Sequence, residues 1–140
     1  MRTTGTLAML LLCACAAKRP MPAVTSAADV ETRWSPSGQA RVDIYASGGN
    51  AFLARLTMAP GAEVPEHRDP TEEYIHVIEG SATMVIDGWR YEVGPGDTVL
   101  MPAGAVVSVE NGDAEMAAFQ VFAGPESAKK YDSWLPEKPE

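Results

Sequence analysis

Short runs of apolar or alternating apolar and polar residues follow one another from Gln39 onward, and turn residues separate them about every 8 to 12 positions. Runs of this length with a period of two predict β-strands rather than helices. We therefore expect an all-β fold, a small jelly-roll β-barrel of about eight or more strands. The runs are Ala40–Ala46, Ala51–Ala59, Glu73–Ile78, Ala82–Ile86, Trp89–Val93, Thr98–Met101, Val106–Val109 and Glu115–Phe122.

Two dipeptides, Asp87-Gly88 and Asn111-Gly112, lie between neighbouring runs. They favour tight type I′ hairpins, because both central residues of that turn need a positive φ. Wider corners are expected at Gly94-Pro95-Gly96 and Pro102-Ala103-Gly104. Closely spaced turns of this kind join antiparallel strands, as a jelly roll requires.

The first residues have the pattern of an export signal. A positive residue, Arg2, precedes the apolar run Leu7–Leu12, which is far shorter than the roughly 20 residues of a membrane span. Leu12-Cys13-Ala14-Cys15 resembles a bacterial lipobox with Cys15 as the lipidated residue. The alternative is ordinary cleavage after Ala14-Cys15-Ala16, which would release a soluble protein. We expect an exported, periplasmic lipoprotein that is anchored to the outer membrane.

The chain therefore divides into four parts. Residues 1–15 form the signal segment, residues 16–38 a flexible tether and lead-in, residues 39–125 the barrel and residues 126–140 a C-terminal tail. One short helical turn is expected in that tail. Both cysteines fall in the signal segment, so the mature domain has no disulfide and depends on core burial for its stability.

The charge balance limits the partners. The formal net charge is −8 and the sequence pI is near 4.7. A nucleic-acid-binding protein needs a basic face, and no such cluster is present in the sequence. Charge also disfavours docking on anionic lipid, so the only expected membrane contact is the lipid anchor.

Two spaced motifs lie within the predicted barrel. The first runs from Pro60 to Gly80, and the second from Gly96 to Asn111. Together they resemble the cupin superfamily, whose motifs are G-x5-H-x-H-x3,4-E-x6-G and G-x5-P-x-G-x2-H-x3-N. Asp69 stands in place of the second His, and Val107 in place of the last. The matching residues are His67, Glu73, Gly80, Gly96, Pro102, Gly104 and Asn111.

In many cupins, three His and one Glu of these motifs bind one metal. The resemblance leaves His67, Asp69 and Glu73 as candidate metal ligands here. Such a set is harder and more anionic, so we expect either no cofactor or a weakly bound divalent metal such as Mn, Mg, Zn or Fe. In the metal-free alternative, His67 pairs with Glu73, and Asp69 turns toward solvent beside Arg68.

The resemblance also orients the strands. The motif Glu of cupins points into the barrel, so Ile75, two residues beyond Glu73, should share its face, and Val107 should point inward too. Gln120, polar within an apolar run, either lines this pocket or satisfies a backbone group. The predicted ligand pocket is therefore His67, Glu73, Ile75, Val107 and Gln120. His76 should face outward.

Small cupins differ widely in function, so the fold leaves several interpretations open. The loss of the last motif His favours a small-molecule-binding module without redox chemistry. The alternative is a divalent-metal-dependent enzyme, an oxygenase or isomerase, that uses His67, Asp69 and Glu73. A structural subunit with a vestigial pocket is a third. We also expect a homodimer, with His76 or the run Ala40–Ala46 near the contact.

Overall fold

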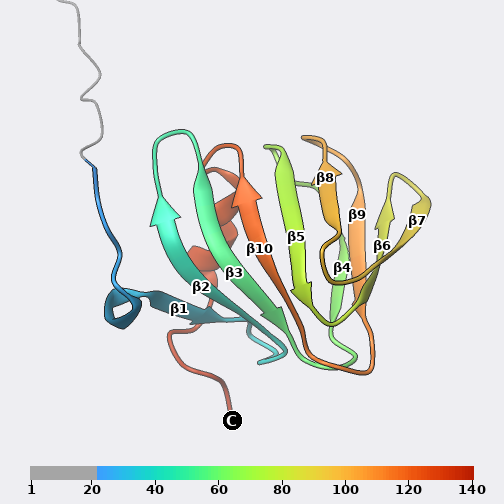
Figure 1. Ribbon diagram of the computed structural model, residues 1–140, viewed down its shortest axis with the longest axis horizontal. Helices are drawn as coiled ribbons and strands as arrows, with labels where there is room; N and C mark the ends of the chain where they lie inside the picture. Colours follow the sequence, from blue (N-terminus) through green and yellow to red (C-terminus); the bar gives the residue numbers. More distant parts are fainter. Residues whose placement is uncertain (1–21) are drawn as a thin grey trace, which may run out of the picture.

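The computed structural model describes residues 22–140, and these residues form two antiparallel sheets (Figure 1). One sheet has six strands in the order β1-β2-β3-β10-β5-β8, and the other has four in the order β4-β9-β6-β7. The predicted all-β jelly roll is confirmed, although the two sheets are not joined into a closed barrel. The signal segment, including Cys15, lies outside the described residues. None of the described helices is long and apolar enough to cross a membrane.

Each of the eight predicted runs coincides with a strand. Two further strands, β1 and β4, were not predicted. The strands are β1 Glu31–Trp34, β2 Ala40–Ser47, β3 Phe52–Met58, β4 Glu63–His67, β5 Glu73–Glu79, β6 Ala82–Ile86, β7 Trp89–Val93, β8 Thr98–Met101, β9 Val107–Asn111 and β10 Met116–Phe122. Two 3-10 helices, η1 Ala27–Asp29 and η2 Ser127–Ser133, lie at the ends of the described chain.

Folded structure extends beyond residues 39–125 on both sides. Strand β1 lies in the expected lead-in and pairs with β2, while Trp34 and Leu135 exchange backbone hydrogen bonds of 2.7 and 2.8 Å. Helix η2 lies behind β2, β3 and β10 in Figure 1, and its Tyr131 packs against Phe52 and Phe122 with ring centroids 5.8 and 6.3 Å away. The tail therefore belongs to the core of the domain.

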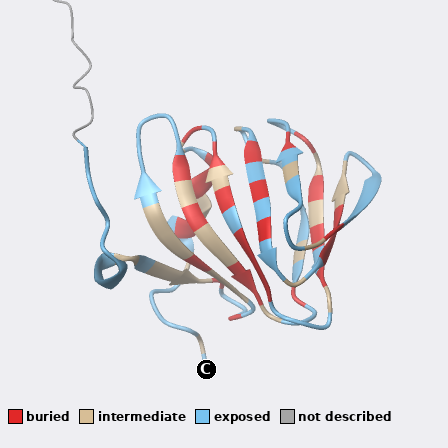
Figure 2. Ribbon diagram, in the orientation of Figure 1, coloured by how far each residue is buried: buried red, intermediate tan, exposed pale blue. Residues whose placement is uncertain are grey.

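Strand β5 shows the alternation that positions the site. Glu73, Ile75 and Val77 are buried, while the side chains between them are exposed, as the banding of β5 in Figure 2 shows. Val107 on β9 is buried as well. The main apolar core lies on these inward faces, and each large side chain fully buried there contributes about 1.5–3 kcal/mol. The inward orientation predicted for Ile75 and Val107 is thus observed.

The two predicted hairpin dipeptides behave differently. Asp87 and Gly88 have φ values of 49° and 84°, as a type I′ turn requires. Neither Asn111 nor Gly112 has a positive φ, so that turn was predicted wrongly. Asn111 instead ends β9, and its side-chain amide donates to the carbonyls of Met58, Ala59 and Ala114 at 2.7–3.1 Å. This residue ties the β3–β4 corner to the end of β9.

Gly80, the last residue of the first motif, is required by close backbone approach. Its φ is 74°, and a Cβ atom at this position would lie 2.3 Å from the carbonyl oxygen of Glu115. No side chain fits there without moving the start of β10. The motif glycine is therefore structural.

Candidate functional site

A cavity of about 250 Å³ lies against the inward faces of both sheets. All five residues of the predicted pocket line it, namely His67, Glu73, Ile75, Val107 and Gln120. Most of the remaining wall is apolar, and it includes the four methionines Met58, Met84, Met101 and Met116. The cavity therefore combines an adaptable apolar wall with a small polar cluster.

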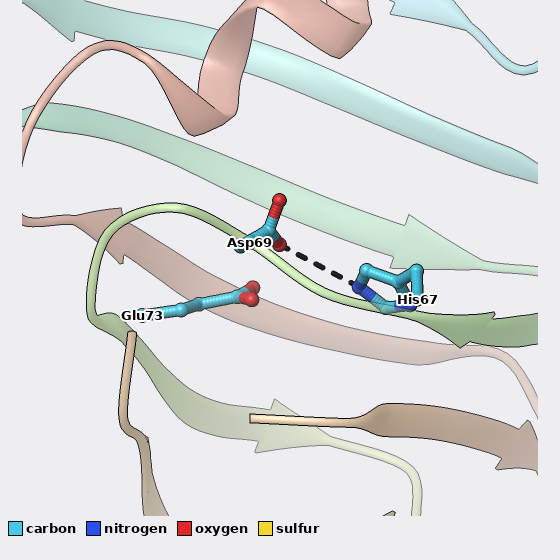
Figure 3. Close-up of side chains that lie close together, drawn as sticks. All are labelled: His67, Asp69 and Glu73. Atoms are coloured by element: carbon cyan, nitrogen blue, oxygen red, sulfur yellow. Dashed lines mark ion pairs between the residues drawn. The ribbon is translucent and has the colours of Figure 1, made fainter. Parts of the chain in front are cut away.

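His67 ends β4 and belongs to this polar cluster. Its Nδ1 lies 3.0 Å from the carbonyl oxygen of Pro65, which can only accept, so Nδ1 carries a hydrogen. Its Nε2 lies 3.5 Å from Oδ2 of Asp69 (dashed in Figure 3). The hydrogen bond to Asp69 raises the pKa of His67 above its usual value, against the opposing effect of burial. Both ring nitrogens are thus placed as donors, which favours the imidazolium form.

Asp69 lies in the loop between β4 and β5, and its side chain is only 12% exposed. Nζ of Lys130 donates to its Oδ2 at 2.6 Å. Burial alone would raise the pKa of Asp69, but the hydrogen bonds from His67 and Lys130 outweigh it and lower the pKa. The expectation that Asp69 turns to solvent beside Arg68 is wrong, because the Lys130 ammonium holds it inward. Arg68 donates to the carbonyl of Gly104 instead.

Glu73 begins β5 and points toward the same space as His67 and Asp69 (Figure 3). It accepts a 2.6 Å hydrogen bond from Nε2 of Gln120, whose Oε1 accepts one of 2.6 Å from the hydroxyl of Tyr131. Burial raises the pKa of Glu73 and that of Tyr131. The predicted pair of His67 with Glu73 is therefore not formed. Glu73 is held by an amide, and His67 by Asp69.

A protein-family model of the cupin domain matches residues 54–122, about half of the chain. The chain belongs to the cupin superfamily. It is also similar to the endoribonuclease YbeY of Myxococcus xanthus (strain DK1622), at 32% identity over 65 residues. That alignment covers 46% of this cupin but only 22% of the relative, so the chain spans about a fifth of the curated protein it matches.

Solved structures support the same fold. An RmlC-like cupin from Shewanella frigidimarina NCIMB 400 superposes with a TM-score of 0.66 at 14% identity, over 74% of this cupin and 92% of that chain. KdgF from Halomonas sp. superposes with a TM-score of 0.66 at 13% identity, over 74% of this cupin and 94% of that chain. The polyketide cyclase RemF from Streptomyces resistomycificus superposes with a TM-score of 0.62 at 23% identity, over 74% of this cupin and 80% of that chain. At these identities the likeness shows the fold alone.

The metal of other cupins can be tested against this donor set. Donor atoms of His67, Asp69 and Glu73 all lie within 4.8 Å of one another, which is compatible with a shared ion. However, Gln120 donates to Glu73, Lys130 donates to Asp69, and Nε2 of His67 is directed at Asp69. Lys130 also places an ammonium beside this set. Val107, directly opposite His67 in the β4–β9 register, puts an apolar wall where the fourth ligand would be. In this arrangement, His67, Asp69 and Glu73 do not fit the metal that other cupins bind.

Two residues of this cluster were missed from the sequence, Lys130 and Tyr131. Both come from η2 and line the cavity. The pair Lys129-Lys130 was visible as the only basic pair in the tail, but nothing in its spacing pointed to the barrel motifs. Only the packing of Tyr131 against the core brings Lys130 to the cavity.

His76 was expected to face away from the pocket, and it does. It is exposed on the outer face of β5, where its Nδ1 lies 2.9 Å from Oγ1 of Thr98. The cross-strand partner of His76 on β10, Phe119, is 42% exposed on the same face. The homodimer contact expected near His76 or along β2 stays a prediction.

Proposed function

We propose that the cavity binds a small organic molecule and that this cupin is a binding module without redox chemistry. The main support is that the polar side chains at the cavity are bonded to one another. His67, Asp69 and Lys130 form one set, and Glu73, Gln120 and Tyr131 form the other. Such a prearranged polar cluster in an apolar cavity is typical of a ligand site.

The cluster favours a ligand that has an apolar body and an acceptor head. Lys130 has three N–H groups and donates one of them to Asp69, which leaves donors for a ligand. The Lys130 ammonium offsets the charge of Asp69, and burial raises the pKa of Glu73. A carboxylate or carbonyl head suits these donors. The methionines allow bodies of more than one shape.

Small carboxylates should bind, and a charge-reversed analogue should not. We expect benzoate and hexanoate to give 1:1 binding by isothermal titration calorimetry, while hexylamine gives none. Val107→Phe should abolish binding by filling the cavity. Ser108→Phe is the matched control, because Ser108 is the next residue of β9 and does not line the cavity. Preferential binding of hexylamine, or equal binding by both Phe variants, would contradict the proposal.

A divalent-metal-dependent cupin enzyme, an oxygenase or isomerase, is the second candidate. It is favoured by the spacing of the donor atoms of His67, Asp69 and Glu73 within 4.8 Å. A metal there would have to displace Lys130 from Asp69. Elemental analysis of protein purified without chelator separates the candidates, since stoichiometric Mn, Mg, Zn or Fe would favour the enzyme.

We also propose that the protein is exported and anchored by lipid at Cys15, to the periplasmic side of the outer membrane. The support is the lipobox-like Leu12-Cys13-Ala14-Cys15 behind a short apolar run. Cys15→Ser should move the protein from the membrane fraction to the soluble fraction, because lipid chains supply the anchor. Cys13→Ser is the matched control and should stay with the membrane. If both variants fractionate alike, Cys15 is not the anchor.

A further inference from the structure

Lys130 places a cation at the cluster of His67, Asp69 and Glu73 in the cavity. Its Nζ lies 2.6 Å from Oδ2 of Asp69 and 5.0 Å from the centroid of the Phe122 ring. The ammonium is therefore oriented by a carboxylate and an aromatic face at once. Its neighbour in sequence, Lys129, is exposed and does not line this cavity.

The segment that carries Lys130 is fixed on both sides. Before it, Ser127 shares a 2.6 Å hydrogen bond with Thr71. After it, the buried Tyr131 donates to Gln120, and Leu135 pairs with the backbone of Trp34. Helix η2 therefore presents the Lys130 side chain to the cavity in a defined position, as a built feature of the fold.

A divalent ion shared by His67, Asp69 and Glu73 would have to lie close to this ammonium. It would need a lone pair on Nε2 of His67, which is now directed as a donor at Oδ2 of Asp69. It would also need an oxygen of Asp69, to which Lys130 already donates. Like charges repel more strongly in a half-buried site such as this one than they do in water. The ammonium thus supplies the positive charge that a metal supplies in other members of the superfamily.

We propose that Lys130 is a tethered cation that takes the place of the metal and closes the site to divalent ions. Removal of the ammonium should then allow a metal to bind to His67, Asp69 and Glu73. This inference rests on the metal-free part of the proposed function and not on its ligand.

The test uses Co²⁺, whose visible absorption reports coordination, with the purified cupin and four variants. Lys130→Met removes the charge and keeps most of the side-chain volume. It should bind one Co²⁺ about two orders of magnitude more tightly than the unsubstituted protein. Lys129→Met is the control for charge, since it makes the same change to a net charge of −8 at a site outside the cavity, and it should change nothing. Adding Asp69→Asn to Lys130→Met should abolish the gain.

Equal Co²⁺ affinity of the unsubstituted protein and Lys130→Met would overturn the inference, whether both bind tightly or neither binds. A gain in Lys129→Met as large as in Lys130→Met would also overturn it. Circular dichroism checks the fold, and Lys130→Gln repeats the test with a polar neutral side chain. Failure of benzoate and hexanoate to bind would count against the proposed ligand, whereas the cobalt result decides the role of Lys130.

Discussion

Asp69→His combined with Val107→His should raise the affinity of the cavity for Ni²⁺ or Fe²⁺ by several orders of magnitude. Val107 is buried on β9 directly opposite His67, so an imidazole there would point into the same space. The first substitution removes the carboxylate that holds the Lys130 ammonium at the site, so the ammonium is free to turn away from the metal. Three imidazoles and Glu73 would then provide nitrogen and oxygen donors that suit these metals better than the present set.

Calorimetric titration of Ni²⁺ into the unsubstituted protein and the double variant measures this change. The control pairs Asp69→His with Ser108→His, which adds the same imidazole one residue along β9, away from the cavity lining. It should gain little. Val107→His places a polar group in the packed core, and Asp69→His enlarges a half-buried polar side chain beside it, so a lower melting temperature is expected. No gain over the control would mean that position 107 does not complete the ligand set.

Most strands, and the direction in which their side chains point, could be predicted from the sequence. A strand that is buried on one face alternates apolar and polar residues with a period of two. Strand β5 is the clearest case, since Glu73 and Ile75 alternate with exposed residues. Two strands left no such pattern. β1 is the polar tetrapeptide Glu31–Trp34, and β4 contains Pro65 between exposed glutamates. β1 and β4 form because they pair with β2 and β9, respectively. The residue pattern within one strand does not indicate such a pairing.

The composition of the pocket could be predicted from the motifs, but its connections could not. His67, Glu73 and Gln120 line the cavity as expected. The motif spacing does not determine which acid pairs with His67, and in the structure the partner is Asp69. Lys130 lies 61 residues from Asp69 in the sequence, within a polar tail whose composition resembles that of any solvated terminus. Only tertiary packing of η2 reveals it.

Asn111→Ala should lower the free energy of unfolding by about 3 kcal/mol or more. Its buried amide group donates to the three carbonyls of Met58, Ala59 and Ala114, and its Oδ1 accepts from the backbone of Gly112. Each buried polar group left without a partner costs about 1–3 kcal/mol. Urea denaturation measures the change. Asn50→Ala is the matched control, because Asn50 is exposed between β2 and β3, and it should stay within about 0.5 kcal/mol.

The site depends on this residue through β4. Asn111 joins the end of β3 and the corner that follows it to the end of β9, and β4 then pairs with β9 up to the register of His67 with Val107. Loss of the amide should therefore loosen His67 as well as the corner, and Asn111→Ala should also weaken benzoate binding. A stability equal to that of Asn50→Ala would show that the last motif residue is not a structural one.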